Sequence, residues 1–350
     1  MEDLVKQLVQ ENYLDADGYY SLIKHCNNNT FDLLRTEAVK TANKYFGKGI
    51  YIRGLIEIGN YCHNDCFYCG LRHSNTNIQR YRLSINEIHD CCISGYKNGI
   101  RTFVLQSGED YHWTDEKLCE IITTIKSSCP DAAITLSLGE RTKSSYRTLF
   151  NAGATRYLLR HEAADMALYN NIHPTWMSHS NRIECIENLI EIGYQTGIGM
   201  MIGVPGQTID SLVEDLIFIQ RIKPQMIGIG PFIPHKDTPM GNNSAGDIRL
   251  SLIILSIVRL IYPNALIPAT TALSTLSTDG HKQAILSGAN VIMPNLSPAY
   301  VRNKYAIYDN KKAFGVEAAE NLLLLQQELN SFGYHIDYSR GDYKPLINNE

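Results

Sequence analysis

The chain contains 350 residues, of which 44% are hydrophobic and 19% are charged, and its formal net charge is −4. These values are typical of a globular enzyme with a large core, and no basic run is present that would bind nucleic acid or an anionic membrane surface. The length exceeds that of most single domains, although α/β barrels commonly reach it as one unit.

Residues 1–48 are expected to form a helical extension. The start, MEDLVKQLVQENYLD, is amphipathic, and a later helix, TFDLLRTEAVKTANKYFG, is expected to end at Gly47. The chain start lacks the basic and apolar segments of a signal peptide, and the most apolar run, LSLIILSIVRLIYP, carries Arg259 and is too short to span a bilayer. We therefore expect a soluble, cytoplasmic protein whose most apolar helix is buried in the fold.

From residue 49 onward, short apolar runs alternate with helical patterns. The apolar runs are YIRGLIEIG, RTFVLQSG, AITLSLGE, RYLLRHE, GIGMMIGVPG, MIGIGPFIPH, ALIPATTA and NVIMPN. The helical patterns between them include SINEIHDCCISGYKNG, DEKLCEIITTIKSS, RIECIENLIEIGYQTG and TIDSLVEDLIFIQRIK. This alternation predicts an α/β fold, a (β/α)8 barrel of TIM type over residues 49–300. Residues 301–350 are expected to form a loop, a closing helix (VEAAENLLLLQQELNSFG) and a polar tail.

Polar residues gather where the predicted strands end, which is where such barrels form their active sites. In chain order they are Cys62, Cys66 and Cys69; Ser107, Gly108, Glu109 and Asp110; Ser137, Gly139 and Glu140; Arg160, His161 and Glu162; His235; Thr270 and Thr271; and Asn295. One rim of the barrel is therefore expected to hold the chemistry.

Three of the nine cysteines lie close together. Cys62, Cys66 and Cys69 stand in NYCHNDCFYCGLR with the spacing C-x3-C-x2-C, directly after the first predicted strand. Iron–sulfur clusters are held by cysteine thiolates, usually four, so three thiolates leave one iron open to a substrate or cofactor. The alternatives are a zinc site, which would need His63 or His73 as its fourth ligand, or three unlinked core cysteines.

This cysteine spacing resembles that of the radical S-adenosylmethionine (SAM) superfamily. The resemblance implies a [4Fe–4S] cluster whose open iron chelates the amino and carboxylate groups of SAM. The reduced cluster then cleaves the C5′–S bond, and a 5′-deoxyadenosyl radical abstracts a hydrogen. Tyr68, the aromatic residue before the third cysteine, has its family counterpart near the adenine.

The resemblance also implies where SAM is held. Ser107, Gly108 and Glu109 are similar to the family's glycine-glycine-glutamate element, with serine in place of the first glycine. Glu162 would accept a hydrogen bond from the ribose or ammonium group, the alternative being a salt bridge to Arg160. Arg182 would bind the SAM carboxylate, the alternative being a solvated residue in the first turn of a helix.

Segments at every strand end, over roughly residues 50 to 310, resemble the HydE family, the radical SAM maturases of [FeFe]-hydrogenase. They include GLIEIGNYCHNDCFYCGLR, VLQSGED, TLSLGE, RYLLRHE, MIGVPGQT, IGIGPFIPH, IPATTA and NVIMPN. The family is related to biotin synthase and methylornithine synthase. The resemblance implies an anaerobic role in building the diiron subcluster of the hydrogenase, with other maturases and an electron donor as partners.

A small organometallic or sulfur-containing substrate is implied inside the barrel. The residues expected to form its pocket are Thr135, Ser137, Met226, His235, Thr270, Thr271 and Tyr308. Tyr305 and Tyr308 either line this cavity or are surface aromatics of the loop after the eighth strand.

Two other functions are open at this point. One is an amino-acid mutase like methylornithine synthase, which would bind lysine tightly. The other is a scaffold that carries a cluster or an organometallic precursor, against which the intact cysteine motif argues. The sequence leaves open the exact substrate, the electron donor and the oligomeric state.

Some HydE family members hold a second iron–sulfur cluster on cysteines beyond the eighth strand. Here the last cysteine is Cys185, and the segment YVRNKYAIYDNKKAFGVEAAEN has none. Ammonium and amide groups are poor iron ligands, so we expect a single [4Fe–4S] cluster per chain.

Overall fold

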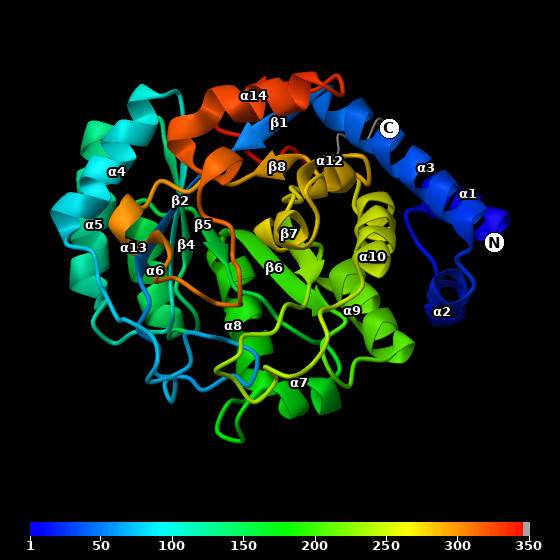
Figure 1. Ribbon diagram of the computed structural model, residues 1–350, viewed down its shortest axis with the longest axis horizontal. Coiled ribbons are helices and arrows are strands. Elements are labelled where there is room, and N and C mark those ends of the chain that lie inside the picture. Colours follow the sequence, from blue (N-terminus) through cyan, green and yellow to red (C-terminus); the bar gives the residue numbers. More distant parts are fainter. Residues whose placement is uncertain (346–350) are drawn as a thin grey trace.

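The computed structural model describes residues 1–345 and shows parallel strands surrounded by helices (Figure 1). Six strands form one continuous parallel sheet in chain order. They are β2 (Gly54–Gly59), β3 (Thr102–Ser107), β4 (Ala133–Ser137), β5 (Arg156–Leu158), β6 (Gln195–Ile202) and β7 (Met226–Pro231). Each strand pairs with the next one along the chain, as expected when a helix connects parallel neighbours.

The sheet closes through β1 (Gly49–Ile52), which directly precedes β2, and β8 (Val291–Ile292), which pairs with it in parallel. The segment that contains Leu266 and Pro268 lies between β7 and β8. Two isolated parallel bridges join it to these strands, from Met226 to Leu266 and from Pro268 to Val291. The predicted barrel is thereby confirmed. The seventh predicted strand, ALIPATTA, does not form a regular strand. Pro268 has no N–H to donate, and helix α11 (Thr271–Leu276) begins within this segment.

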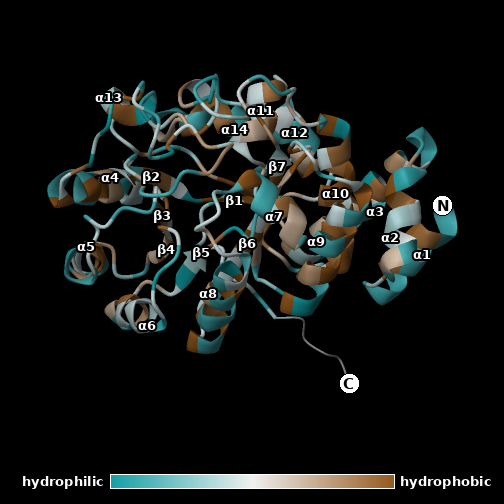
Figure 2. Cartoon of the chain, turned by 90° about the horizontal axis from the view of Figure 1, so that it is seen from below, coloured by the Kyte–Doolittle hydropathy of each residue, from teal (hydrophilic) through white to brown (hydrophobic). Residues whose placement is uncertain are grey.

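Helices cover the outer face of the barrel, and they carry hydrophobic and hydrophilic residues side by side (Figure 2). They are α4 (Ile85–Lys97), α5 (Asp115–Ser128), α6 (Lys143–Ala152), α7 (Met166–Ile172), α8 (His179–Ile192), α9 (Ile209–Ile222), α10 (Ile248–Ile261), α12 (Gly280–Ile285) and α13 (Ala299–Arg302). The sequence pattern marks α4, α5, α8, α9 and α10 but not the others, most of which have too few turns to show a clear period.

Three N-terminal helices lie at one side of the barrel (Figures 1 and 2). They are α1 (Glu2–Glu11), α2 (Ala16–Lys24) and α3 (Asn28–Phe46), and they pack on α9 and α10. Because α10 is covered on its outer face as well, its side chains from Ser251 to Ile261 are all buried. No helix of the described residues is long and apolar enough to cross a bilayer.

The inner face of the barrel is polar. Ile56, Ile134 and Leu136 belong to the hydrophobic core that packs against the helices. Successive residues of a strand point to opposite faces, so their neighbours Glu57 and Thr135 face inward. Both are buried, with Glu57 at 0% exposure.

Glycines on the inner face leave space for a long side chain. A Cβ atom on Gly199 would lie 3.3 Å from Arg160 Cγ, and one on Gly228 would lie 3.7 Å from Arg160 Nη1. Arg160, which follows β5, therefore extends over these two glycines of β6 and β7.

The C-terminal segment differs from the predicted long helix and polar tail. The helix is α14 (Leu322–Asn330), preceded by two 3₁₀ turns, η1 (Gly315–Glu317) and η2 (Ala319–Asn321). After it comes a strand, β9 (His335–Asp337), which pairs in parallel with β1. The tail prediction is wrong there because it rests on polarity, whereas an edge strand needs only backbone groups for pairing.

The following residues contact the N-terminal ends of the strands. Asp342 forms an ion pair with Arg156, and the carbonyl of Arg340 accepts a hydrogen bond of 2.7 Å from Thr102 Oγ1. Asn264 Nδ2 donates to the carbonyl of Lys344 at 2.7 Å. The tail therefore covers the end of the barrel opposite the expected active-site rim.

A buried charged cluster ties the C-terminal segment to α12. His281 Nε2 lies 3.1 Å from Glu317 Oε1, and His281 Nδ1 lies 3.8 Å from Glu328 Oε1. Burial alone lowers the pKa of His281, but the ion pairs with Glu317 and Glu328 outweigh it and raise the pKa to about 9.

We expect this cluster to make stability pH-dependent. A histidine in the unfolded chain titrates near ~6.5, so the contribution is fully present below that pH and is lost as pH rises through about 9. His281→Gln should cost about 3–5 kcal/mol near pH 6 and much less at pH 9.5. Urea unfolding at both pH values checks this, with His25→Gln, an exposed histidine, as the control. Equal losses at both pH values would contradict it.

Candidate active site

The three clustered cysteines lie on the loop that follows β2, at the carboxyl-terminal rim of the barrel. All three are free thiols and partly buried. The amide of Cys69 donates to the carbonyl of Cys66 at 3.3 Å, and Cys66 Sγ lies 3.7 Å from the thioether sulfur of Met177. The fold thus gathers these thiols on a single short turn.

An ion pair inside the loop fixes its shape. Both carboxylate oxygens of Asp65 accept from Arg72, each at 2.7 Å, and Asp65 also accepts from the amide and hydroxyl of Ser74. These contacts hold the pKa of Asp65 well below its usual range, with the Arg72 hydrogen bonds as the largest cause. The loop is therefore ordered by polar contacts.

Burial raises the pKa of each thiol. The pKa of Cys62 rises to about 11 and that of Cys69 to about 12, while Cys66 lies well above its ordinary value. Nearby charge adds to the effect, from Glu109 at Cys62 and from the other two sulfurs at Cys66. A bound metal cluster would have to displace these protons.

The zinc alternative finds no support in residues 1–345. No three His, Cys, Asp or Glu side chains there converge closely enough to hold a single metal ion. His63 Nδ1 contacts the carbonyl of Glu109 at 2.8 Å, its ring stacks on Tyr111, and His73 is exposed. A cubane spreads its ligands over separate irons, so three thiols on one turn fit a cluster better than one zinc ion.

The residues after β3 pack directly against the cysteine loop. A Cβ atom on Gly108 would lie 2.4 Å from the carbonyl oxygen of Tyr61 and 2.6 Å from Cys62 Cβ. Only glycine therefore allows this approach. Ser107 is buried, and its hydroxyl donates to the carbonyl of Gly108.

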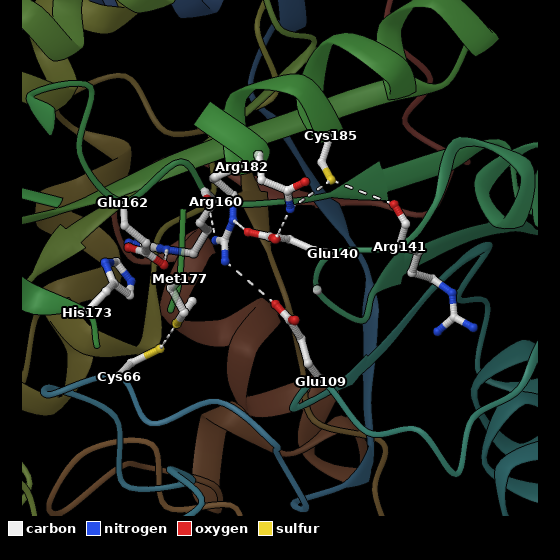
Figure 3. A network of polar contacts seen from close by, with 12 residues as sticks. Cys66, Glu109, Glu140, Arg141, Arg160, Glu162, His173, Met177, Arg182 and Cys185 are labelled. Carbon is white, nitrogen blue, oxygen red and sulfur yellow. Dashed lines mark hydrogen bonds and ion pairs between the residues drawn. The ribbon is translucent and has the colours of Figure 1, made fainter. Parts of the chain in front are cut away.

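Arg182, at the start of α8, is buried between two carboxylates (Figure 3). Its Nε donates to Glu140, its Nη2 lies 3.6 Å from Glu109 Oε1, and its Nη1 donates to the carbonyl of Arg160 at 2.7 Å. The alternative of a solvated residue is excluded. Burial raises the pKa of Glu109, Arg182 opposes that rise, and Glu140 adds to it.

Glu162 has one paired and one unpaired carboxylate oxygen. Its Oε1 accepts from Arg160 Nε at 3.0 Å, which is the salt bridge named as the alternative. Its Oε2 is buried and has no hydrogen-bond partner. Its φ of 65° is unusual for a non-glycine residue and costs of order 1–3 kcal/mol. A strained backbone that supports an unpaired buried carboxylate oxygen is typical of a ligand site.

Tyr68 is held by a neutral histidine. Its hydroxyl lies 3.2 Å from His173 Nε2, and His173 Nδ1 lies 2.8 Å from the carbonyl of Tyr169. The carbonyl can only accept, so Nδ1 carries the proton and Nε2 accepts from Tyr68. Burial lowers the pKa of His173 to about 4, which keeps the ring neutral at physiological pH.

The residues expected to form the substrate pocket lie at different depths. Thr135 is buried within β4 and its Oγ1 has no partner, and Met226 Sδ lies 2.9 Å from Arg53 Nη1. Ser137, at the end of β4, is partly exposed. Arg53 is also buried, with Nε and Nη2 unpaired. It precedes β2 and Met226 begins β7, so this pair lies at the N-terminal ends of the strands, beside Arg156 and Asp342, and not at the rim.

Other pocket candidates lie nearer the rim. Thr270 donates to the carbonyl of Ile229 at 3.3 Å, and Thr271 donates to Glu317 at 3.2 Å. His235 packs against the cysteine loop, because a Cβ atom on Gly70 would lie 2.4 Å from its ring.

The two tyrosines after β8 are not surface residues. Tyr305 is 2% exposed and Tyr308 is partly buried. Burial raises the pKa of both phenols, and Glu57 on the inner barrel face contributes to each rise. Both rings therefore lie near the barrel interior.

Several site residues escape prediction from the sequence. Glu140 stands at a strand end, but nothing marks it as the partner of Arg182. Met177 carries no motif at all. Lys311, in the loop beyond β8, forms a buried ion pair of 2.6 Å with Glu57 Oε1. The other carboxylate oxygen of Glu57, Oε2, accepts a hydrogen bond of 3.0 Å from Asn295 Nδ2.

Comparisons with known proteins give the family and the fold of the chain. A model described as the Radical SAM superfamily matches residues 56–219. The "[FeFe] hydrogenase maturase subunit HydE" of Thermotoga maritima is 44% identical over 268 residues, 77% of this chain and 76% of that protein. The 3-methylornithine synthase of Methanosarcina acetivorans is 27% identical over 289 residues, 82% of this chain and 81% of that protein. The crystal structure of methylornithine synthase (PylB) matches with a TM-score of 0.81 at 22% identity, over 95% of this chain and 97% of that one, which shows the shared fold.

The contact at Gly108 gives a stability test. Gly108→Ala should displace the cysteine loop and cost about 1–3 kcal/mol, because backbone and Cβ atoms would overlap. Gly228→Ala is the matched control, since its Cβ would meet nothing closer than 3.7 Å. The free energy of unfolding of the cluster-free protein measures both. If the Gly108→Ala protein is as stable as the control, the cysteine loop can move away from the added methyl group without loss of stability, and the prediction is wrong.

Proposed function

The chain belongs to the HydE family of radical SAM enzymes, as its sequence motifs predict, and on this premise we propose that it acts in maturation of the diiron subcluster of an [FeFe]-hydrogenase. The support is an identity of 44% to a hydrogenase maturase over 77% of the chain.

The observation that carries the proposal is the arrangement around the cysteine loop. Cys62, Cys66 and Cys69 lie on one turn, beside the unpaired buried oxygen of Glu162 and the buried guanidinium of Arg182. Thiols, an unpaired acceptor and a cation on one rim suit a cofactor that has an ammonium, a carboxylate and a sulfonium group.

We assign the three cysteines to a single [4Fe–4S] cluster with SAM on its open iron. When bound, these groups supply one-electron cleavage of SAM to a 5′-deoxyadenosyl radical. Glu162 would accept a hydrogen bond from SAM with Oε2, and Arg182 would offer N–H groups that its carboxylate partners do not use. Tyr68, fixed by His173, would lie along the adenine, and the backbone of Ser107 to Glu109 would receive the amino group.

The inner barrel suits a small anionic substrate that bears sulfur. Thr135 Oγ1 is buried without a partner, and farther from the rim two nitrogens of Arg53 are unpaired beside the thioether of Met226. Because unpaired buried polar groups are costly, a ligand that satisfies them would gain affinity. We propose an iron-bound, cysteine-derived substrate from a partner maturase, and a separate electron donor that reduces the cluster.

One other enzyme function is open to the same test. The 27% identity to 3-methylornithine synthase over 82% of the chain favours, as a second candidate, an amino-acid mutase that acts on lysine. The two candidates share the cluster and SAM chemistry and differ in what fills the barrel.

Anaerobic reconstitution tests the assignment of the cysteines. The wild-type protein should take up about four irons per chain and form 5′-deoxyadenosine on reduction with SAM. Cys62→Ala, Cys66→Ala and Cys69→Ala should each abolish this product without lowering the unfolding midpoint much, because the loop lies at the rim. Cys119→Ala, away from the loop, serves as the control. A loop variant that cleaves SAM at the wild-type rate would overturn the assignment.

The same assay separates the two candidate functions. A cysteine-bound iron carbonyl–cyanide complex should increase 5′-deoxyadenosine formation, whereas L-lysine should not. Stimulation by lysine alone would favour the mutase.

The SAM contacts give a quantitative expectation. Glu162→Gln and Arg182→Ala should each weaken SAM binding roughly tenfold to a hundredfold, through loss of a charge-assisted hydrogen bond. Equilibrium binding to reconstituted protein measures this, with Glu187→Gln on the exposed face of α8 as the control. Wild-type affinity in both variants would remove these residues from the SAM site.

A further inference from the structure

Arg80 joins the two ends of the cysteine loop. Its Nη1 donates to the carbonyl oxygen of Asn60 and to that of Leu71 at 2.9 Å. Its Nη2 donates to the carbonyls of Arg72 at 2.7 Å and Asn75 at 3.2 Å. One guanidinium therefore links the chain before the first clustered cysteine to the chain after the third.

The ends of the loop have few other links. Asn60 Nδ2 donates to the carbonyls of Gln79 and Lys304, and the amide of Tyr81 donates to Asn60 Oδ1. These contacts fix the start of the loop. These contacts join Asn60 to Gln79 and Tyr81, whereas among the residues that the structure describes only the side-chain hydrogen bonds of Arg80 join Asn60 to residues 71–75.

The charge of Arg80 is not neutralised by a carboxylate. Its neighbours Arg72 and Arg82 are each paired, with Asp65 and Asp110, at 2.7 Å. Arg80 has no ion pair within residues 1–345, and its four hydrogen-bond acceptors are neutral carbonyls. A positive charge therefore stands unbalanced beside the cysteine loop.

That charge lies close to two of the thiols. Arg80 Nη1 contacts the carbonyls of Asn60 and Leu71, which stand two residues before Cys62 and two residues after Cys69. The guanidinium is thus close enough to two of the three proposed cluster ligands to interact with their charge.

We propose that Arg80 is a positioning residue for the cluster, which holds the cysteine loop in its ligand-bearing shape and balances the charge of the bound thiolates. The inference rests on the proposed function only for the cluster itself. The ordering of the loop by Arg80 is a property of the protein chain alone.

Three physical effects support the proposal. The planar fork of an arginine can bridge several carbonyls at once, which the ammonium of lysine cannot do with the same geometry. A loop ordered before its ligand arrives loses less conformational entropy on binding, so it binds more tightly. A positive charge near the cluster also favours the reduced, more negative state and raises the reduction potential.

The test uses the full chain with Arg80→Gln and Arg80→Lys. Arg221→Gln is the matched control, because it removes an exposed arginine from the last turn of α9, away from the cysteine loop. Hydrogen exchange of residues 60–75 in the cluster-free protein reports loop order. Iron bound per chain after anaerobic reconstitution, and the midpoint potential of the cluster without SAM, report the effect on the cluster.

Both Arg80 variants should increase amide exchange in residues 60–75 at least about tenfold, with unchanged exchange in the barrel strands, and should retain less iron. The midpoint potential should become more negative in Arg80→Gln but stay near the wild-type value in Arg80→Lys and Arg221→Gln. If Arg80→Gln fails to fold, the exchange and iron retention of Arg80→Lys decide.

If the amides of residues 60–75 exchange at the wild-type rate in both Arg80 variants, the proposal is overturned. A potential that shifts equally in Arg80→Lys, Arg80→Gln and Arg221→Gln would overturn the charge effect. If the wild-type chain itself takes up no cluster, the proposed function fails, while the exchange measurement still tests Arg80 in the cluster-free chain.

Discussion

All strands of a closed parallel barrel end at the same rim, and this constraint determines where the functional side chains of this protein lie. The cysteine loop follows β2, Glu109 follows β3, Glu140 follows β4, and Glu162 follows β5. None of these residues is near another in the sequence, yet the order of the sheet makes their strands neighbours. A ligand at this rim is therefore in reach of thiols, carboxylates and guanidiniums together.

Such a rim brings carboxylates close together, and arginines pair with them. Arg182 lies between Glu109 and Glu140, and Arg160 pairs with Glu162. The guanidinium stays charged and presents several donors in one plane, which suits it to join two acidic groups at once. The pairing is incomplete at one atom, Glu162 Oε2, and a ligand can bind where the protein leaves an acceptor unsatisfied.

The barrel interior differs from a fully packed core. Gly199 and Gly228 give room to Arg160, while the C-terminal tail covers the opposite end of the barrel through Asp342 and Lys344. The loop beyond β8 brings Tyr305 and Lys311 toward the same interior, where Lys311 pairs with Glu57. Different segments of the chain thus supply the space, the charges and the closed end of the barrel interior.

The sequence by itself determined the barrel, the N-terminal helices, the cysteine loop and the family, because these depend on local patterns: apolar periodicity, cysteine spacing and motifs at strand ends. It missed β9, the irregular seventh strand and the short helices, whose local patterns are weak. Only the tertiary structure decided which partner each charged side chain has. Arg182 meets Glu140, Lys311 meets Glu57, and Arg80 joins both ends of the cysteine loop. These contacts join residues from separate elements, and they are fixed by the packing of strands and loops around a closed barrel, which no local pattern records.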